Sequence, residues 1–150
     1  MYKSNKKNLM KLTPIEVIDL SVSLGKDLIL DKISCSIKNN SITAVIGPNG
    51  AGKSIFLQTI NGLTNIDNGK ITFNKIYNND EIRNKQAMVF QTPTLLRRNV
   101  KSNMDFVSNV KNKNGKLIIK NILKRVGLEE YDNKPARLLS GGEKQRLSLA

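Results

Sequence analysis

The chain has 150 residues, of which 39% are hydrophobic, so it can build the core of one domain. It carries 25 lysines and arginines against 12 aspartates and glutamates, with no histidine, and its formal net charge is +13. No apolar run approaches the roughly 18 residues that span a bilayer, and no signal-peptide-like apolar segment follows the basic start. From these features we expect no membrane-spanning helix and no export signal, and we expect a cytoplasmic protein.

The positive charge is spread along the chain. The basic residues are scattered among asparagines and isoleucines, which indicates general composition and not a binding patch, so we expect no nucleic-acid partner. Only the lysines of the first eleven residues form a cluster. We therefore expect residues 1–14 to be a basic disordered tail.

Two strands are the first elements expected after this tail, at residues 15–22 and 28–37, because apolar and β-branched residues alternate there. The turn signal Gly25-Lys26-Asp27 separates them, so they should pair as antiparallel strands. The single cysteine, Cys35, can form no intrachain disulfide and is expected to pack as a small hydrophobe in a reducing compartment. Residues 42–46 are almost continuously apolar, which is typical of a buried parallel strand.

The motif G-x-x-x-x-G-K-[ST] follows this expected strand and opens a helix-like run. Its residues are Gly47, Pro48, Asn49, Gly50, Ala51, Gly52, Lys53 and Ser54. The glycines allow successive backbone N–H groups to turn toward one cluster of phosphates, and the helix start adds its positive dipole end. Lys53 supplies a cation for the outer phosphates, and the Ser54 hydroxyl can complete a Mg²⁺ shell. The motif predicts a site for a nucleoside triphosphate with Mg²⁺.

Beyond this loop the pattern changes from strands to helices. The first helix should bury Phe56, Ile60 and Leu63 and end at Gly62. Residues 70–73 and 86–90 are predicted to be further strands. Two amphipathic helices should follow from residue 100 onward. Their apolar faces are Met104, Val107 and Val110 in one helix and Leu117, Ile118, Ile122 and Val126 in the other. We expect a helical subdomain at about residues 93–139, inserted in an α/β domain that covers residues 15–150.

A second motif, Leu139-Ser140-Gly141-Gly142-Glu143, opens the last expected helix. Locally it is a capping box, in which the serine and glutamate side chains satisfy backbone N–H groups at the helix start. Together with residues 144–150 it resembles the signature motif of ATP-binding cassette (ABC) ATPases. The loop sequence GPNGAGKS also matches that family, and Gln91 in Val89-Phe90-Gln91 matches its Q-loop. The chain resembles the N-terminal portion of an ABC transporter ATP-binding subunit, which implies a P-loop NTPase α/β core with an antiparallel β subdomain and a helical insertion.

The resemblance implies a site built by two subunits. In the family, two such subunits dimerise head to tail, and each ATP lies between the P-loop of one and the signature residues of the other, here Ser140, Gly141 and Gly142. Nucleotide contacts would come from residues 47–55, including Ile55 where relatives often have threonine. Ser54 and Gln91 would hold Mg²⁺, and Gln91 is the catalytic candidate beside the attacking water.

The implied partners are a second ATPase subunit and an integral membrane permease, which places the subunit at the inner face of the cell membrane. Hydrolysis would then drive solute import. Within the family, residues 93–103 are most similar to oxyanion importers of the tungstate, molybdate and phosphate type. Leu24 stands where relatives carry an aromatic residue that stacks on adenine, which predicts weaker recognition of the base.

The family's catalytic acidic strand and switch histidine have no counterpart in the sequence. We therefore expect a chain truncated before the second acidic motif and inactive as an ATPase on its own. One alternative within the family is a soluble ATPase of DNA repair or translation. Repair ATPases of this kind separate the two motifs by a long coiled coil, and no sustained heptads lie between Ser54 and Ser140. The alternative from another class is a non-catalytic nucleotide-binding module or fragment.

Overall fold

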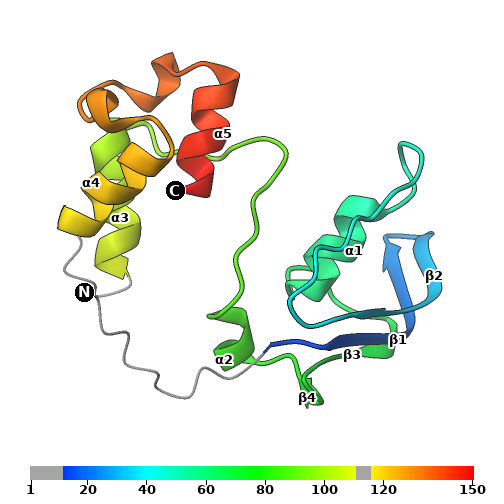
Figure 1. Cartoon of the computed structure of the whole chain (residues 1–150). Helices are drawn as coiled ribbons and strands as arrows, with labels where there is room; N and C mark the ends of the chain where they lie inside the picture. The colour runs from blue at the N-terminus through cyan, green and yellow to red at the C-terminus, as the bar shows by residue number, and fades with distance from the viewer. Residues whose placement is uncertain (1–11, 111–115) are drawn as a thin grey trace. The chain divides into compact units, whose positions relative to one another are not determined.

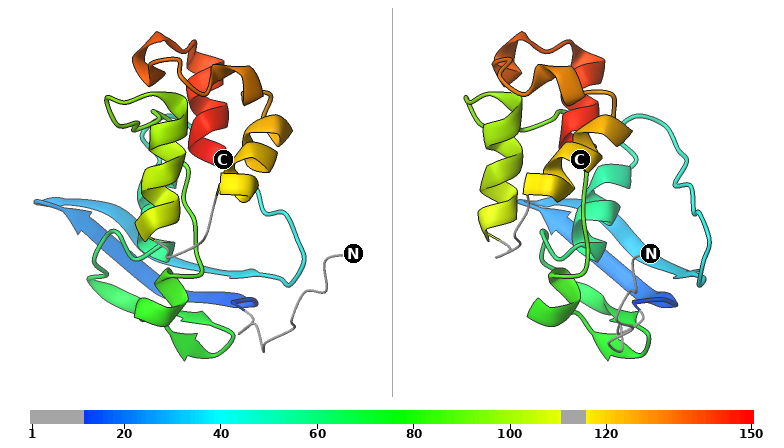
Figure 2. Two further views of the ribbon diagram at one scale, coloured as in Figure 1. Left: turned by 90° about the vertical axis from the view of Figure 1, so that its left-hand side faces the viewer. Right: turned by 60° about the vertical axis from the view of Figure 1, so that its left-hand side comes forward.

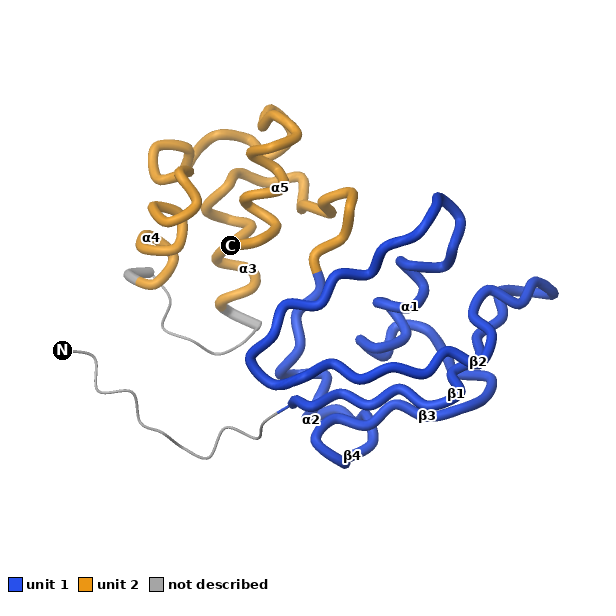
Figure 3. Tube along the Cα trace, turned by 45° about the vertical axis from the view of Figure 1, so that its right-hand side comes forward, with its two compact units in different colours: residues 1–88 blue, residues 89–150 orange. Residues whose placement is uncertain are grey.

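The computed structural model describes residues 12–110 and 116–150. They form two compact units, residues 1–88 and 89–150, which are coloured separately in Figure 3. Most of the predicted tail, at residues 1–11, lies outside the described residues. Among the described residues, no helix is long and apolar enough to cross a membrane.

Unit 1 is built on a four-stranded antiparallel sheet (Figure 1). Its strands are β1 (Ile15–Leu24), β2 (Asp27–Ile37), β3 (Asn68–Phe73) and β4 (Ile76–Tyr77), in the order β2-β1-β3-β4. The hairpin of β1 and β2 pairs Leu24 with Asp27 and Ile15 with Ile37. Alternation of apolar and polar residues therefore predicted this antiparallel subdomain correctly.

One face of the sheet is covered by helix α1 (Lys53–Ile60), as Figure 1 shows. The buried side chains of this core are Val17, Leu20, Val22, Leu30, Phe56, Ile60, Ile71, Phe73 and Ile82. The helix ends at Ile60 because Gly62 turns the chain with a φ of +77°. Leu63, which was expected on the buried face, lies past this end and is 57% exposed.

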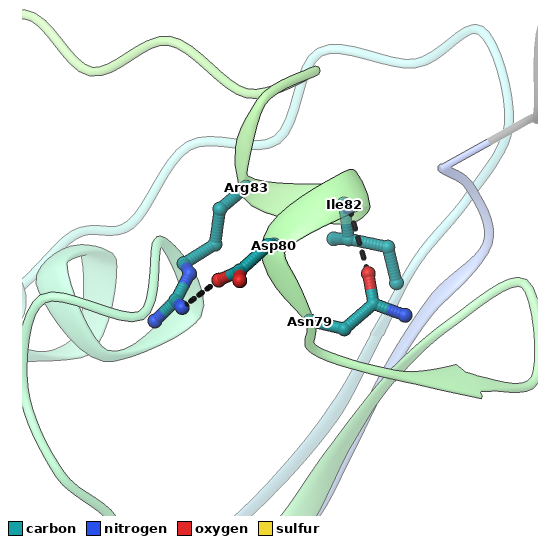
Figure 4. Close-up of polar contacts among 4 residues, drawn as sticks. All are labelled: Asn79, Asp80, Ile82 and Arg83. Carbon is teal, nitrogen blue, oxygen red and sulfur yellow. Dashed lines mark hydrogen bonds and ion pairs between the residues drawn. The ribbon is translucent and has the colours of Figure 1, made fainter.

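A single turn of helix, α2 (Asp80–Arg83), closes the first unit. Figure 4 shows two of its polar contacts: Oδ1 of Asn79 accepts a hydrogen bond from the N–H of Ile82 at 2.9 Å, and Asp80 forms an ion pair with Arg83. The Asn79 cap satisfies an N–H that the helix start leaves unpaired. This turn places Ile82, which is fully buried, against the sheet core.

Two predicted strands are not formed. Residues 42–46 and 86–90 have no strand pairing, and the side chains of Ile42 and Ile46 are 102% and 91% exposed. A strand is stable only when a neighbour bonds to its backbone. Among the described residues, the strands form one sheet, β2-β1-β3-β4, in which every pair is antiparallel, so residues 42–46 have no parallel partner.

Cys35 was expected to be packed in the core, but it is exposed on β2. Cys35 keeps the two-residue period of β2 with Ile33 and Ile37, but all three line the groove beside residues 43–46, so the thiol is left accessible. Partial burial, together with the nearby Glu16 carboxylate, raises the pKa of the Cys35 thiol.

Unit 2 is helical, and its helices lie side by side in the two views of Figure 2. They are α3 (Val100–Val110), α4 (Lys116–Arg125), α5 (Gly141–Leu149) and two short 3-10 turns, Glu129–Tyr131 and Ala136–Leu138. The buried core comprises Val100, Met104, Ile119, Leu123, Leu128, Ala136, Leu139 and Leu147.

The predicted apolar faces of α3 and α4 are only partly correct. Met104 is buried, but Val107 is 54% and Ile118 is 43% exposed. Both line an apolar groove of about 500 Å³ between α3, α4 and α5. The side chains of Val110 and Leu117, which were predicted for the same faces, lie outside the described residues.

Candidate functional site

The loop of residues 47–54 has the backbone geometry that its glycines predict. Gly50 and Gly52 adopt φ values of +83° and +78°, a region that other residues rarely enter. A Cβ on Gly52 would lie 2.9 Å from Leu30 Cδ2 and 3.2 Å from the Ile29 carbonyl oxygen. Glycine at this position lets the loop pack directly on β2 as it enters α1.

The start of α1 is free of side-chain caps. Gly52 is its N-cap residue and makes no side-chain hydrogen bond, and the first turn holds no acidic residue. The first N–H groups of a helix have no partner within the helix, and the helix dipole is positive at this end. These N–H groups and the φ-positive glycines are the features by which helix starts bind anions such as phosphate.

The side chain of Lys53 closes back over the loop. Its Nζ donates to the carbonyl oxygen of Gly47 at 2.9 Å and to that of Pro48 at 2.6 Å. An ammonium group has three donors, so a third remains for a phosphate oxygen. Lys53 therefore both fixes the shape of the loop and holds a positive charge at its centre.

Two neighbours of Lys53 contribute differently. Ser54 is exposed at the start of α1, where its hydroxyl can reach a metal ion or a phosphate. Ile55 is partly buried and packs its side chain against the core of unit 1. Only the backbone N–H of Ile55 is therefore suited to the ligand, which explains how isoleucine can occupy this position.

The second candidate region, at the start of α5, has a complete capping box. The N–H of Ser140 donates to Oε2 of Glu143, and the N–H of Glu143 donates to Oγ of Ser140. Lys134 Nζ lies 3.6 Å from the same Glu143 oxygen and 4.2 Å from the ring centre of Tyr131. These contacts, first of all the hydrogen bond from the Ser140 backbone, lower the pKa of the Glu143 carboxyl.

No packing among residues 12–110 and 116–150 explains the two glycines that follow Ser140. A Cβ on Gly141 would meet nothing within 4 Å, and one on Gly142 would approach only the end of the Arg146 side chain, at 3.8 Å. Because neither residue has a side chain, the backbone of the first turn of α5 is exposed. A bare helix start is accessible to a large anion that comes from outside the chain.

Gln91 lies in unit 2, on the same unit as the signature residues. It is exposed and follows Phe90, whose carbonyl oxygen accepts a hydrogen bond from Nε2 of Gln145 at 3.4 Å. The structure thus gathers residues 47–55 in unit 1, and gathers Gln91 with residues 140–142 in unit 2. Sequence reasoning assigned no role to Gln145, because an amide on a helix carries no pattern that would identify its partner.

Leu24, the candidate for base contact, lies at the end of β1 and is 46% exposed. The hairpin that begins there leads within six residues to Leu30, which contacts the loop at Gly52. An aliphatic side chain at this place offers apolar contact to a base but no aromatic stacking.

Comparison with known proteins identifies the family. The family model described as ABC transporter matches residues 30–150. The chain is 36% identical to the methionine import ATP-binding protein MetN of Clostridium tetani, over 91% of the chain and 46% of that protein. It is 34% identical to the tungstate uptake system ATP-binding protein TupC of Peptoclostridium acidaminophilum, over 91% of the chain and 64% of that protein.

Solved structures agree in fold. The structure of cbiO1 from Clostridium perfringens, part of the ABC transporter complex cbiONQ, superposes with a TM-score of 0.75 at 30% identity over 90% of the chain and 59% of that protein. The ATP binding subunit of an ABC transporter superposes with a TM-score of 0.78 at 24% identity over 91% of the chain. The chain spans about half to two thirds of the length of these relatives. The predicted P-loop α/β fold is therefore confirmed, and the chain belongs to the ABC transporter family of ATP-binding proteins.

Proposed function

We propose that this chain is the nucleotide-binding part of an ABC importer subunit that binds ATP with Mg²⁺ and, as a dimer, hydrolyses it. The observation that carries the proposal is the loop of residues 47–54. Its two φ-positive glycines, its uncapped helix start and the Lys53 ammonium converge on one place. Relatives named for methionine import and tungstate uptake support import as the process, and no particular solute is assigned.

In this proposal, the contacts to each nucleotide come from two copies of the chain. The N–H groups of residues 50–55 and Lys53 would hold the phosphates, and Ser54 with Gln91 would hold Mg²⁺, which neutralises phosphate charge when bound. The bare start of α5, at Ser140, Gly141 and Gly142, would meet the γ-phosphate on a second subunit. A membrane permease at the inner face of the membrane is the further proposed partner.

Residues 1–150 alone are proposed to bind nucleotide without turning it over. Hydrolysis needs a base that takes a proton from the attacking water. The candidate residues include neither a carboxylate nor an imidazole, and Gln91 can orient water but cannot accept its proton at neutral pH. Turnover in the native protein would therefore depend on a base outside this set.

Calorimetric titration with Mg-ATP tests the nucleotide site. Lys53→Ala removes the cation from the loop and should weaken binding roughly 10- to 150-fold, because a hydrogen bond to a charged group contributes about 1.5–3 kcal/mol. The matched control is Lys70→Ala on β3, whose exposed side chain makes no hydrogen bond or ion pair among the described residues. An unchanged affinity in Lys53→Ala would refute the P-loop assignment.

A further inference from the structure

Residues 89–100 form the segment that carries Gln91. This segment is attached to residues 134–145, which include Ser140, at two places: Phe90 at its near end and Asn99 at its far end. At its far end, the N–H of Ala136 donates to the carbonyl oxygen of Arg98 at 2.9 Å, and Asn99 forms a β-bridge with Pro135. The N–H of Val100 donates to the carbonyl oxygen of Lys134 at 3.1 Å. These two hydrogen bonds, which together make the bridge, join the chain after Gln91 to the chain that leads into Ser140.

This far attachment is rigid because a buried side chain supports it. Asn103 is 8% exposed, and its Oδ1 accepts from the N–H of Leu96 at 2.8 Å. Its Nδ2 donates to the carbonyl oxygens of Leu96 at 3.2 Å and Asn99 at 2.9 Å. A buried amide with all of these partners satisfied defines one conformation of the turn.

The near attachment depends on one side chain. Nε2 of Gln145, on the second turn of α5, donates to the carbonyl oxygen of Phe90 at 3.4 Å. Across the described part of the chain, no other hydrogen bond reaches the backbone of residues 89–92. The position of the backbone next to Gln91 therefore depends on Gln145, whereas the other end of the segment is held by several contacts.

We propose that Gln145 is a positioning residue that fixes the backbone of Gln91 to the signature helix. With this contact made, Ser140 at the start of α5 and Gln91 beside Phe90 move as one body. With it broken, the start of the segment is free while its far end stays attached at residues 98–100. The inference rests on the proposed function, in which Gln91 orients the attacking water and Ser140 meets the phosphate.

Gln145→Glu tests the contact with little change in shape, because a carboxylate has the size of the amide but no donor for the Phe90 carbonyl. We expect the kcat of ATP hydrolysis by the native protein to fall roughly three- to ten-fold, the size expected for one hydrogen bond, with the Kd for ATP unchanged. The matched control is Asn121→Asp on the exposed side of α4, which makes the same amide-to-acid change. Its kcat should equal that of the parent.

A double-mutant cycle separates positioning from a general structural effect. If Gln145 acts through Gln91, Gln145→Glu should change kcat by less than about two-fold in a Gln91→Ala background. Equal fold losses in both backgrounds would overturn the proposal, since the effect would then not pass through Gln91. Thermal unfolding midpoints that match the parent would show that the helix itself is intact.

Backbone relaxation supplies a readout that needs no hydrolysis. In nucleotide-free protein, Gln145→Glu should lower the NMR order parameters of the amides at Gln91 and Thr92 while leaving those of Val100 and Ala136 unchanged. Asn121→Asp should change neither set. Unchanged order parameters at Gln91 would overturn the inference even if ATP is bound and hydrolysed, whereas lower values in a protein without ATPase activity would uphold the contact and refute only the proposed function.

Discussion

The backbone N–H of Ser140 donates a hydrogen bond to Oε2 of Glu143 at 2.6 Å, and the N–H of Glu143 donates to Oγ of Ser140 at 3.2 Å. This reciprocal pair satisfies two N–H groups at the start of α5 and fixes the direction in which the helix start points. The arrangement has consequences for stability and for ligand binding, and they can be measured separately.

The stability consequence depends on pH. The pKa of Glu143 is lowered in the folded chain, so its carboxylate stabilises the fold above the ordinary glutamate pKa of about 4.3, and this contribution is lost as the pH falls through the lowered value. Glu143→Gln keeps a side chain that can complete the box but removes the charge. We expect its unfolding midpoint to lie below that of the parent at pH 7.

The difference between parent and Glu143→Gln should shrink as urea unfolding is repeated at successively lower pH, from 7 down to 3. Glu129→Gln is the matched control, because Glu129 makes no hydrogen bond or ion pair among the described residues. A difference that stays constant across this pH range would show that the charge of Glu143 does not contribute.

The ligand-binding consequence concerns Ser140. Aspartate is as good an N-cap residue as serine, so Ser140→Asp should leave the unfolding midpoint of the chain nearly unchanged. Its negative charge would, however, repel the γ-phosphate on the second subunit. We expect ATP binding by single subunits to be retained and ATP-driven dimerisation to be lost, as measured by sedimentation.

Asn79→Asp, at the cap of α2, adds the same charge at another helix start and should dimerise normally. Equal loss of dimerisation in both variants would show that added charge alone is responsible. Loss of ATP binding in Ser140→Asp would show instead that Ser140 serves its own subunit.

Leu24 leads to a prediction about nucleotide selectivity. The family resemblance puts an adenine-stacking aromatic where this chain has leucine, and one base–aromatic stack contributes about 1–3 kcal/mol. Leu24→Tyr should tighten ATP binding by roughly five-fold or more, whereas the parent should bind ATP and GTP with similar affinity. Leu28→Tyr is the matched control on the same hairpin, because Leu28 is 56% exposed. Equal gains in both variants would place the base elsewhere.

The elements predicted correctly from the sequence are those whose interacting residues are neighbours in the chain. The hairpin of β1 and β2 is local, and the capping box lies within four residues, so both could be predicted from neighbouring positions. Sequence reasoning failed for residues 42–46, because a parallel strand depends on neighbours that are distant in the sequence. The contact between Gln145 and Phe90 joins residues that are 55 positions apart, and no periodicity marks either of them.

The exposed side chains of residues 42–46 lead to the last prediction. Ile42 is 102% exposed, and this unpaired apolar segment borders an apolar groove of about 360 Å³ beside β2. Backbone groups without a ladder partner, next to apolar side chains, promote association between chains. Residues 1–150 expressed alone should therefore bind the dye ANS and self-associate.

Ile42→Lys should reduce both dye binding and self-association, because a lysine opposes edge-to-edge pairing. It should not reduce stability, since the side chain of Ile42 is not packed. Ile18→Lys, on the sheet at 41% exposure, tests whether any added charge has the same effect. Equal suppression by both variants would show that net charge, and not the segment of residues 42–46, controls association of this chain.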